Sequence, residues 1–127
     1  MSTANLRRAL YGTYSLAYKV TDKALEDETK AYIIINSIDI DYDSLANSDT
    51  DLKTYIVNLE LRHNSTTSTD IDILEDFIVN NLLNLKTNLK QNNLETMMLS
   101  INSSTDNSDT DAGYYSRILT LSLILKV

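Results

Sequence analysis

Residues 68–89, STDIDILEDFIVNNLLNLKTNL, decide the fold that we predict for this chain. Six apolar residues of this stretch follow one another at intervals of three or four positions: Ile71, Leu74, Ile78, Leu82, Leu85 and Leu89. That spacing places them on one stripe of an α-helix, which Phe77 widens. Lys86 and Lys90 near the end of the stretch match the negative end of the helix dipole. We therefore expect one long amphipathic helix that needs a cover for its apolar stripe.

Alternating apolar residues on both sides of this helix predict the strands that supply the cover. The expected strands are residues 14–20, 32–42, 52–63, 97–101 and 114–127. A short helix is expected from Ser2 or Thr3 to about Tyr11, where Gly12 would end it. Short connections favour antiparallel neighbours. The predicted class is α+β, an antiparallel sheet with one long amphipathic helix packed on one face and a short N-terminal helix.

The length of 127 residues fits one domain, so we expect a single domain over residues 1–127. Two polar stretches interrupt the apolar pattern, at residues 43–51 and 102–113. We expect both to form long hairpin loops, and loops of this kind often carry contacts.

Composition excludes several classes of function. The net charge of −7 argues against binding nucleic acid by neutralising phosphates. The chain has no cysteine, which excludes thiol catalysis and cysteine-rich metal sites, and its two glycines cannot build a glycine-rich phosphate loop. No run approaches the ~20 apolar residues of a membrane span, and the start MSTANLRRALYG lacks the apolar core of a secretory signal. We expect a soluble intracellular or particle-associated protein without a cofactor.

The sequence gives no set of residues typical of an enzyme. His63 is the only histidine, so one chain cannot build a two-histidine metal site, and no G-x-S-x-G motif is present. We expect His63 to be a surface residue at a strand end and the protein to be non-enzymatic.

Closely spaced acidic residues suggest calcium as one alternative, because hard cations prefer several carboxylate oxygens. They are Asp39, Asp41, Asp43, Asp49 and Asp51. Compared with a calcium loop that begins D-x-D-x-D, the chain has Ser44 where glycine makes the sharp turn and Thr50 where a glutamate closes the shell. Residues two apart in a strand share a face, so these aspartates also fit a solvated or subunit-facing strand edge, which we favour.

A second acidic group, formed by Asp106, Asp109 and Asp111, lies in the other polar stretch and fits a solubilising loop. The chain also holds eight tyrosines, a residue type enriched at protein interfaces. Our candidate subunit or partner contacts are Asp43, Ser44, Asn47, Asp49, Asp51, Asp106, Asp109, Asp111 and Tyr114.

The order of these elements resembles the tail-completion or tail-terminator family of tailed bacteriophages. The resemblance rests on a short N-terminal helix, the strands LAYKV and YIIINSIDI, an acidic hairpin into TYIVNLELRH, the helix DILEDFIVNNLLNL and the closing strand YYSRILTLSLILKV. The chain lacks the proline that many members carry before the second strand.

This resemblance implies a virion structural protein, assembled in the host cytoplasm as a ring at the neck of the particle. The ring is commonly a hexamer, with larger rings as the alternative. Its partners would be the portal, connector or adaptor on one side and tail proteins on the other, and DNA would pass through its channel without specific binding. The alternative from another class is a small monomeric calcium-binding or protein-binding module that uses the acidic hairpin at residues 39–51.

Overall fold

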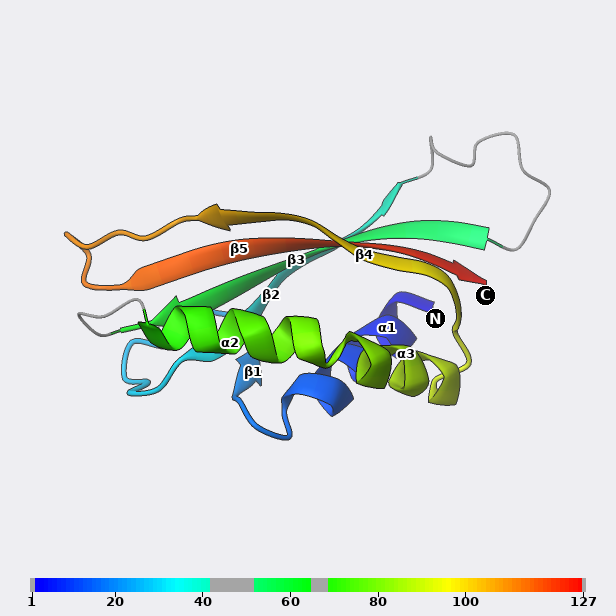
Figure 1. The fold of residues 1–127 in the computed structure, drawn as a ribbon, viewed down its shortest axis with the longest axis horizontal. Coiled ribbons are helices and arrows are strands. Elements are labelled where there is room, and N and C mark those ends of the chain that lie inside the picture. The colour runs from blue at the N-terminus through cyan, green and yellow to red at the C-terminus, as the bar shows by residue number, and fades with distance from the viewer. Residues whose placement is uncertain (1, 42–51, 65–68, 127) are drawn as a thin grey trace.

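The computed structural model describes residues 2–41, 52–64 and 69–126. The elements in chain order are α1 (Ser2–Tyr14), β1 (Val20–Thr21), β2 (Tyr32–Asp41), β3 (Leu52–His63), α2 (Thr69–Asn80), α3 (Leu82–Gln91), β4 (Glu95–Asp106) and β5 (Tyr115–Lys126). They form an α+β fold in which the three helices lie on one face of a five-stranded sheet (Figure 1).

The sheet is mixed, with the strand order β1-β2-β3-β5-β4. β1 is parallel to β2, while the other neighbouring pairs are antiparallel, so the predicted wholly antiparallel sheet is wrong at this edge. β3 and β5 form a ladder from Leu52↔Lys126 to His63↔Tyr115. Because α2 and α3 connect β3 to β4, which lies beyond β5, the chain crosses over the sheet here instead of turning back in a hairpin.

The predicted single long helix is wrong, because the helix is interrupted at Asn81. The Asn81 backbone N–H contacts the carbonyl oxygens of both Phe77 and Ile78, at 3.1 and 3.2 Å, and its side-chain amide donates to the Phe77 carbonyl at 2.8 Å. An asparagine side chain that competes for backbone groups in this way disfavours a regular helix. The apolar stripe is retained across the break, since Ile71, Leu74, Ile78, Leu85 and Leu89 are buried and Leu82 is half-buried.

The N-terminal helix is longer than predicted. α1 continues through Gly12 to Tyr14, which is fully buried with Leu6 and Leu10 of the same helix. These three residues are spaced by four, so the helix extends its apolar face by one more turn. The strand predicted over residues 14–20 is therefore wrong, and β1 holds only two residues.

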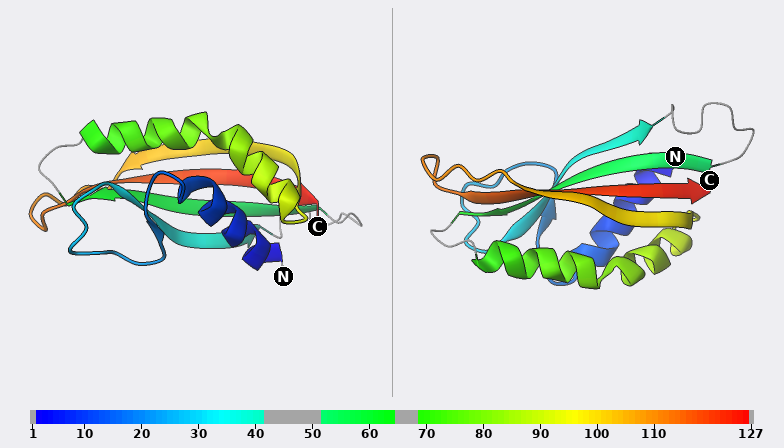
Figure 2. Two further views of the ribbon diagram at one scale, coloured as in Figure 1. Left: turned by 90° about the horizontal axis from the view of Figure 1, so that it is seen from below. Right: turned by 45° about the horizontal axis from the view of Figure 1, so that its top comes forward.

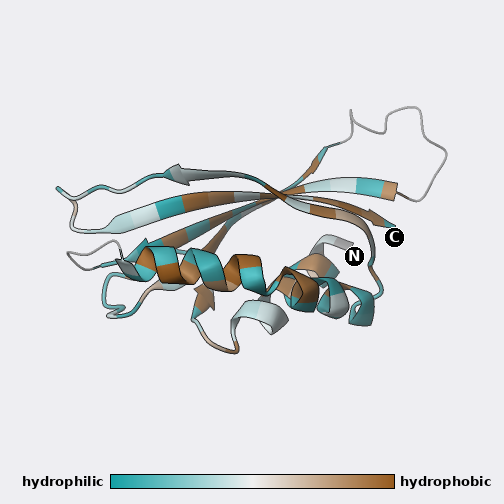
Figure 3. Cartoon of the chain, viewed as in Figure 1, coloured by the Kyte–Doolittle hydropathy of each residue, from teal (hydrophilic) through white to brown (hydrophobic). Residues whose placement is uncertain are grey.

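The core lies between the helices and one face of the sheet. Alternate residues of the long strands are buried in it, and β3 and β5 are rich in hydrophobic residues (Figure 3). The strand residues buried here are Ile33, Ile35, Tyr55, Val57, Leu59, Leu61, Leu119, Leu121, Leu123 and Leu125.

The second polar stretch is shorter than the predicted loop at residues 102–113. β4 continues to Asp106, which pairs with Arg117, so the loop between β4 and β5 covers only residues 107–114. Within it, Asp109 and Tyr114 form a bridge and Gly113 adopts a φ of +88°, which glycine tolerates without strain. The polar residues at the end of β4 form a strand because the backbone of β5 continues alongside them and pairs with their backbone. The other predicted loop, residues 43–51, lies outside the described residues.

None of the helices in the described ranges combines the length and apolar character needed to cross a membrane.

Candidate interaction surface

The face of the sheet opposite the helices carries an uncharged surface, which we call the outer patch. No helix of the described chain covers it (Figures 1 and 2). The register places its residues next to one another on the four longer strands. The outer patch consists of Ser37, Thr54, Ile56, Asn58, Met98, Ser100, Ser103, Ile118, Thr120, Ser122 and Ile124. None of these positions holds a charge, but Asp39 and Asp41 of β2 lie on the same face, where they pair with Ile56 and Thr54 and border the patch.

Cross-strand hydrogen bonds order the middle of the outer patch. The Asn58 amide donates to Ser37 Oγ at 3.0 Å, and Asn58 Oδ1 accepts a hydrogen bond from Thr120 Oγ1 at 2.8 Å. Burying a polar group is costly only when it loses its hydrogen-bond partner. Because these side chains satisfy one another, a partner can cover the centre of the patch at little desolvation cost.

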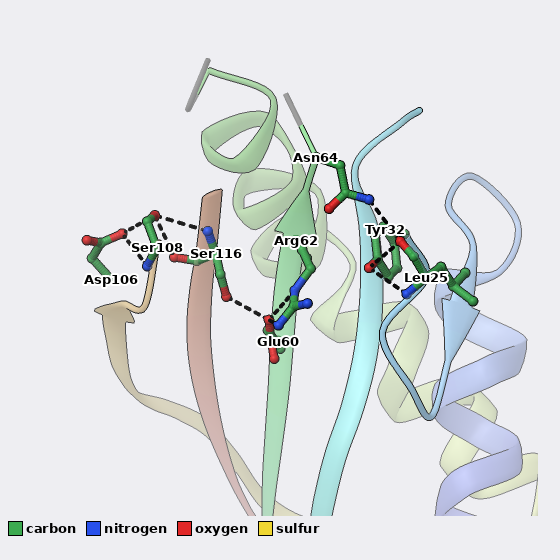
Figure 4. A network of polar contacts seen from close by, with 8 residues as sticks. All are labelled: Leu25, Tyr32, Glu60, Arg62, Asn64, Asp106, Ser108 and Ser116. Carbon is green, nitrogen blue, oxygen red and sulfur yellow. Dashed lines mark hydrogen bonds and ion pairs between the residues drawn. The ribbon is translucent and has the colours of Figure 1, made fainter. Parts of the chain in front are cut away.

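Charged residues border the outer patch at one end, where Glu60 and Arg62 follow one another on the same face of β3 (Figure 4). Arg62 Nη2 lies 2.6 Å from Glu60 Oε2, which also accepts a hydrogen bond from Ser116 Oγ at 2.9 Å. The Glu60 and Arg62 side chains are 7% and 17% exposed, and the guanidinium lies 3.9 Å from the centroid of the Tyr114 ring. Removing one partner of a buried ion pair typically costs about 3–5 kcal/mol, so this network fixes the end of the patch.

Residues 22–31, which form neither helix nor strand, cover the corner of the sheet beside Arg62. The Tyr32 hydroxyl accepts a hydrogen bond from the Leu25 N–H at 2.9 Å and donates to the Leu25 carbonyl at 3.2 Å. The Asn64 amide donates to the same carbonyl at 2.8 Å (Figure 4). This cover ends at the corner and leaves the outer patch open.

The two predicted acidic groups lie at opposite ends of the sheet. Asp39 is exposed and Asp41 is half-buried in β2, and Asp41 pairs with Thr54 near the start of β3. Asp106 lies at the other end, beside Arg117, which pairs with Leu61 near the end of β3. The remaining candidates of the first group, Asp43, Ser44, Asn47, Asp49 and Asp51, lie outside the described residues.

The structure brings the second group together in the turn between β4 and β5. Asp106 Oδ1 accepts a hydrogen bond from Ser108 Oγ at 2.7 Å, and Asp109 Oδ1 accepts one from the Ala112 N–H at 3.0 Å. Asp111 is exposed, and Tyr114 lies against Arg62. We call Asp106, Asp109 and Asp111 the acidic tip. Within the described ranges, no three histidine or acidic side chains gather as metal ligands would.

The prediction that His63 is a surface residue is wrong, since its residue exposure is 4%. His63 Nε2 lies 3.3 Å from the Thr29 carbonyl oxygen and 3.5 Å from Asp70 Oδ2. The start of α2 and the segment before β2 therefore enclose the ring.

Sequence reasoning missed the Glu60–Arg62–Ser116 network. The alternation in β3 placed Glu60 and Arg62 on the polar face, but the contribution of Ser116 depends on the register with β5. One feature of the sequence does indicate the ion pair: Glu60 and Arg62 have opposite charges and lie two residues apart on one strand, which places them on the same face.

No protein-family model matches this sequence, and comparison with curated proteins finds no match.

Proposed function

We propose that the chain is a non-enzymatic structural subunit that assembles through its outer patch. One observation carries this proposal: an uncharged, internally hydrogen-bonded surface is bordered by charged residues. These are Glu60 and Arg62 at one end, Glu95 and Lys126 at the other, and Asp39 and Asp41 along β2. Protein interfaces have the same arrangement, with few charges at the centre and a polar rim. A solvated sheet face normally carries polar residues, whereas the outer patch also holds the apolar residues Ile56, Met98, Ile118 and Ile124.

The resemblance to tail-completion and tail-terminator proteins gives the proposed assembly its form. We place the chain as a tail-terminator-like α+β domain in a ring at the neck of a tailed phage, with a hexamer as the first expectation. The neighbours would be portal, connector or adaptor proteins and tail proteins. The net charge of −7 supports this placement, because an acidic ring does not retain the DNA that passes through it.

The substitution Thr120→Lys tests the outer patch at its centre. Thr120 is half-buried on β5, and a lysine there places a charge in the proposed interface. The loss of its hydrogen bond to Asn58 should cost only about 1 kcal/mol of folding stability. We therefore expect a folded chain that self-associates much more weakly than the unmodified chain, measured by light scattering across a concentration series and by electron microscopy of large species.

The matched control is Asn80→Lys, which adds the same charge on an exposed position of α2. This variant should assemble like the unmodified chain. Equal assembly of the Thr120→Lys variant would contradict a role for the outer patch. An unmodified chain that stays monomeric up to about 1 mM would contradict the subunit proposal and favour the binding-module alternative.

A further inference from the structure

Three lysines surround a pocket at the end of the sheet where β5 finishes. The pocket has a volume of about 670 Å³ and is lined by Lys86 and Lys90 of α3, Lys126 of β5, Glu95 of β4 and residues of the turn between α3 and β4. Within the described chain, none of the three lysines forms an ion pair. The chain has 11 basic residues against 18 acidic ones, so three unpaired cations in one pocket are a marked concentration of positive charge.

The local fold explains why these lysines converge. Lys86 and Lys90 are four residues apart, which places them on the same side of α3. Asn93 then adopts a φ of +65° and turns the chain into β4, whose first residue, Glu95, pairs with Lys126. Lys90 lies in the last turn of α3, where the helix dipole favours a cation. We call Lys86, Lys90 and Lys126 the lysine pocket.

The acidic tip is the matching surface at the opposite end of the same β4–β5 ladder. Lys126 pairs with Glu95 at one end and Arg117 pairs with Asp106 at the other, nine residues away along β5. A rise of about 3.4 Å per residue separates the two ends by about 30 Å. The lysine pocket therefore cannot reach the acidic tip of its own chain.

We propose that the lysine pocket binds the acidic tip of a second copy of this chain, head to tail. The inference rests on the proposed function and adds the head-to-tail contact from which a ring can be built. A contact between two different surfaces of one subunit is heterologous, and repeating it closes a ring when the rotation allows. Complementary charge selects this partner and fixes its orientation.

The conformation of the acidic tip supports this partner. Asp106 and Asp109 use Oδ1 to hold the turn, which leaves Oδ2 of each carboxylate without a hydrogen bond in the described part of the chain. A turn that is already ordered loses little conformational entropy on binding. A phosphate backbone is the other anion that could fit the lysine pocket, but the net charge of −7 opposes the approach of nucleic acid.

A pair of charge-reversed variants tests the contact. The pocket variant combines Lys86→Glu with Lys90→Glu. The tip variant combines Asp109→Asn, Thr110→Lys and Asp111→Lys. An asparagine at position 109 can still accept the hydrogen bond from Ala112, and Thr110 and Asp111 are exposed, so the turn should be retained. The two variants change the net charge equally and in opposite directions.

Sedimentation velocity up to about 1 mM compares each variant alone with their equimolar mixture. Each variant alone presents its pocket and tip with like charge, so we expect self-association at least tenfold weaker than in the unmodified chain. In the mixture, the acidic pocket of one variant meets the basic tip of the other, and both contacts regain opposite charge. The mixture should therefore restore assembly, with the two variants alternating. The control Lys23→Glu with Lys30→Glu makes the same charge change on exposed residues elsewhere and should assemble normally.

The possible results separate the inference from the proposed function. If each charge-reversed variant assembles like the unmodified chain, or if the mixture fails to restore assembly, the inference is overturned while the outer patch remains a subunit contact. If the unmodified chain is monomeric up to about 1 mM, both are overturned. If the pocket variant assembles normally but loses salt-dependent binding to a short DNA duplex, the lysine pocket is a phosphate site instead.

Discussion

Tyr14 is a buried residue whose polar atom has no partner. Its side chain lies in the core and contacts the edge of Phe77, with ring centroids 6.1 Å apart. Its hydroxyl forms no hydrogen bond within the described chain. Burial raises the pKa of Tyr14 well above the usual tyrosine range, because the phenolate would lose its hydration.

Tyr14→Phe should leave folding stability at pH 7 unchanged or raise it by up to about 1 kcal/mol, since it removes an unsatisfied hydroxyl. Tyr32→Phe is the control, because it removes a hydroxyl that is bonded to Leu25, and it should lower stability by about 1 kcal/mol. Urea unfolding of both variants checks this. A loss of more than about 1 kcal/mol in Tyr14→Phe would mean that the hydroxyl has a partner.

The same residue predicts a pH dependence. The raised pKa means that the folded chain keeps the Tyr14 proton at a pH where the unfolded chain has lost it. The contribution of Tyr14 to stability is therefore complete below the tyrosine pKa of about 10 in the unfolded state and is lost as the pH rises above it. Urea unfolding between about pH 8 and pH 11 should give a smaller alkaline loss of stability in Tyr14→Phe than in the unmodified chain. Equal slopes would contradict the raised pKa.

At the scale of elements, the helix stripe supports a direct test of packing. Leu74 of α2 is fully buried, whereas Leu83 of α3 is 74% exposed. Leu74→Ala should cost about 2–5 kcal/mol in free energy of unfolding, because it leaves a cavity in the core. Leu83→Ala removes the same atoms from a solvated site and should cost less than about 0.5 kcal/mol. Denaturant unfolding that gives similar costs for both would contradict this packing of the helices.

Periodicity predicted the elements that bury a regular stripe. The spacing of Ile71, Leu74 and Ile78 identified the helical face, and the alternation from Tyr55 to Leu61 identified the inner face of β3. Periodicity did not predict the break at Asn81, because a side-chain bond to a backbone carbonyl leaves the apolar spacing unchanged. Periodicity also predicted a strand at Tyr14. This residue fits two patterns, because it lies four positions after Leu10, as in a helix, and also begins the apolar alternation that follows it.

The candidate surfaces were less predictable than the fold, because they depend on register. The sequence places Thr120 and Ile124 on the outer face of the last strand, but only pairing with β3 and β4 assembles the outer patch. Lys86 and Lys90 are recognisable as helix neighbours. Lys126 joins them through its pairing with Glu95, which no local pattern encodes. The sequence predicts the acidic tip as one group within a longer loop, because polar residues that pair at a sheet edge show no apolar alternation.

At the scale of the whole molecule, the charges of the β4–β5 ladder are unequally distributed. Within this ladder the lysine pocket lies at one end and the acidic tip at the other, while Asp39 and Asp41 lie on β2, across β3 from the ladder. The outer patch lies between the two ends. Copies arranged head to tail would place unlike ends together while their outer patches remain available for a second contact. The two unlike ends would therefore orient each copy head to tail in an assembly. A self-complementary patch alone does not impose such an order.

This arrangement predicts that salt acts in opposite directions on the unmodified chain and on the pocket variant Lys86→Glu with Lys90→Glu. The Debye length falls from about 10 Å at 0.1 M salt to about 3 Å at 1 M, so both attraction and repulsion between charges at the surface are screened. In the unmodified chain the screening weakens the contact between lysine pocket and acidic tip, and association should fall as NaCl rises. In the pocket variant it relieves the repulsion between two acidic surfaces, and association through the neutral outer patch should rise. Sedimentation velocity at both salt concentrations measures the two trends, and trends of the same sign would contradict a charge-selected contact.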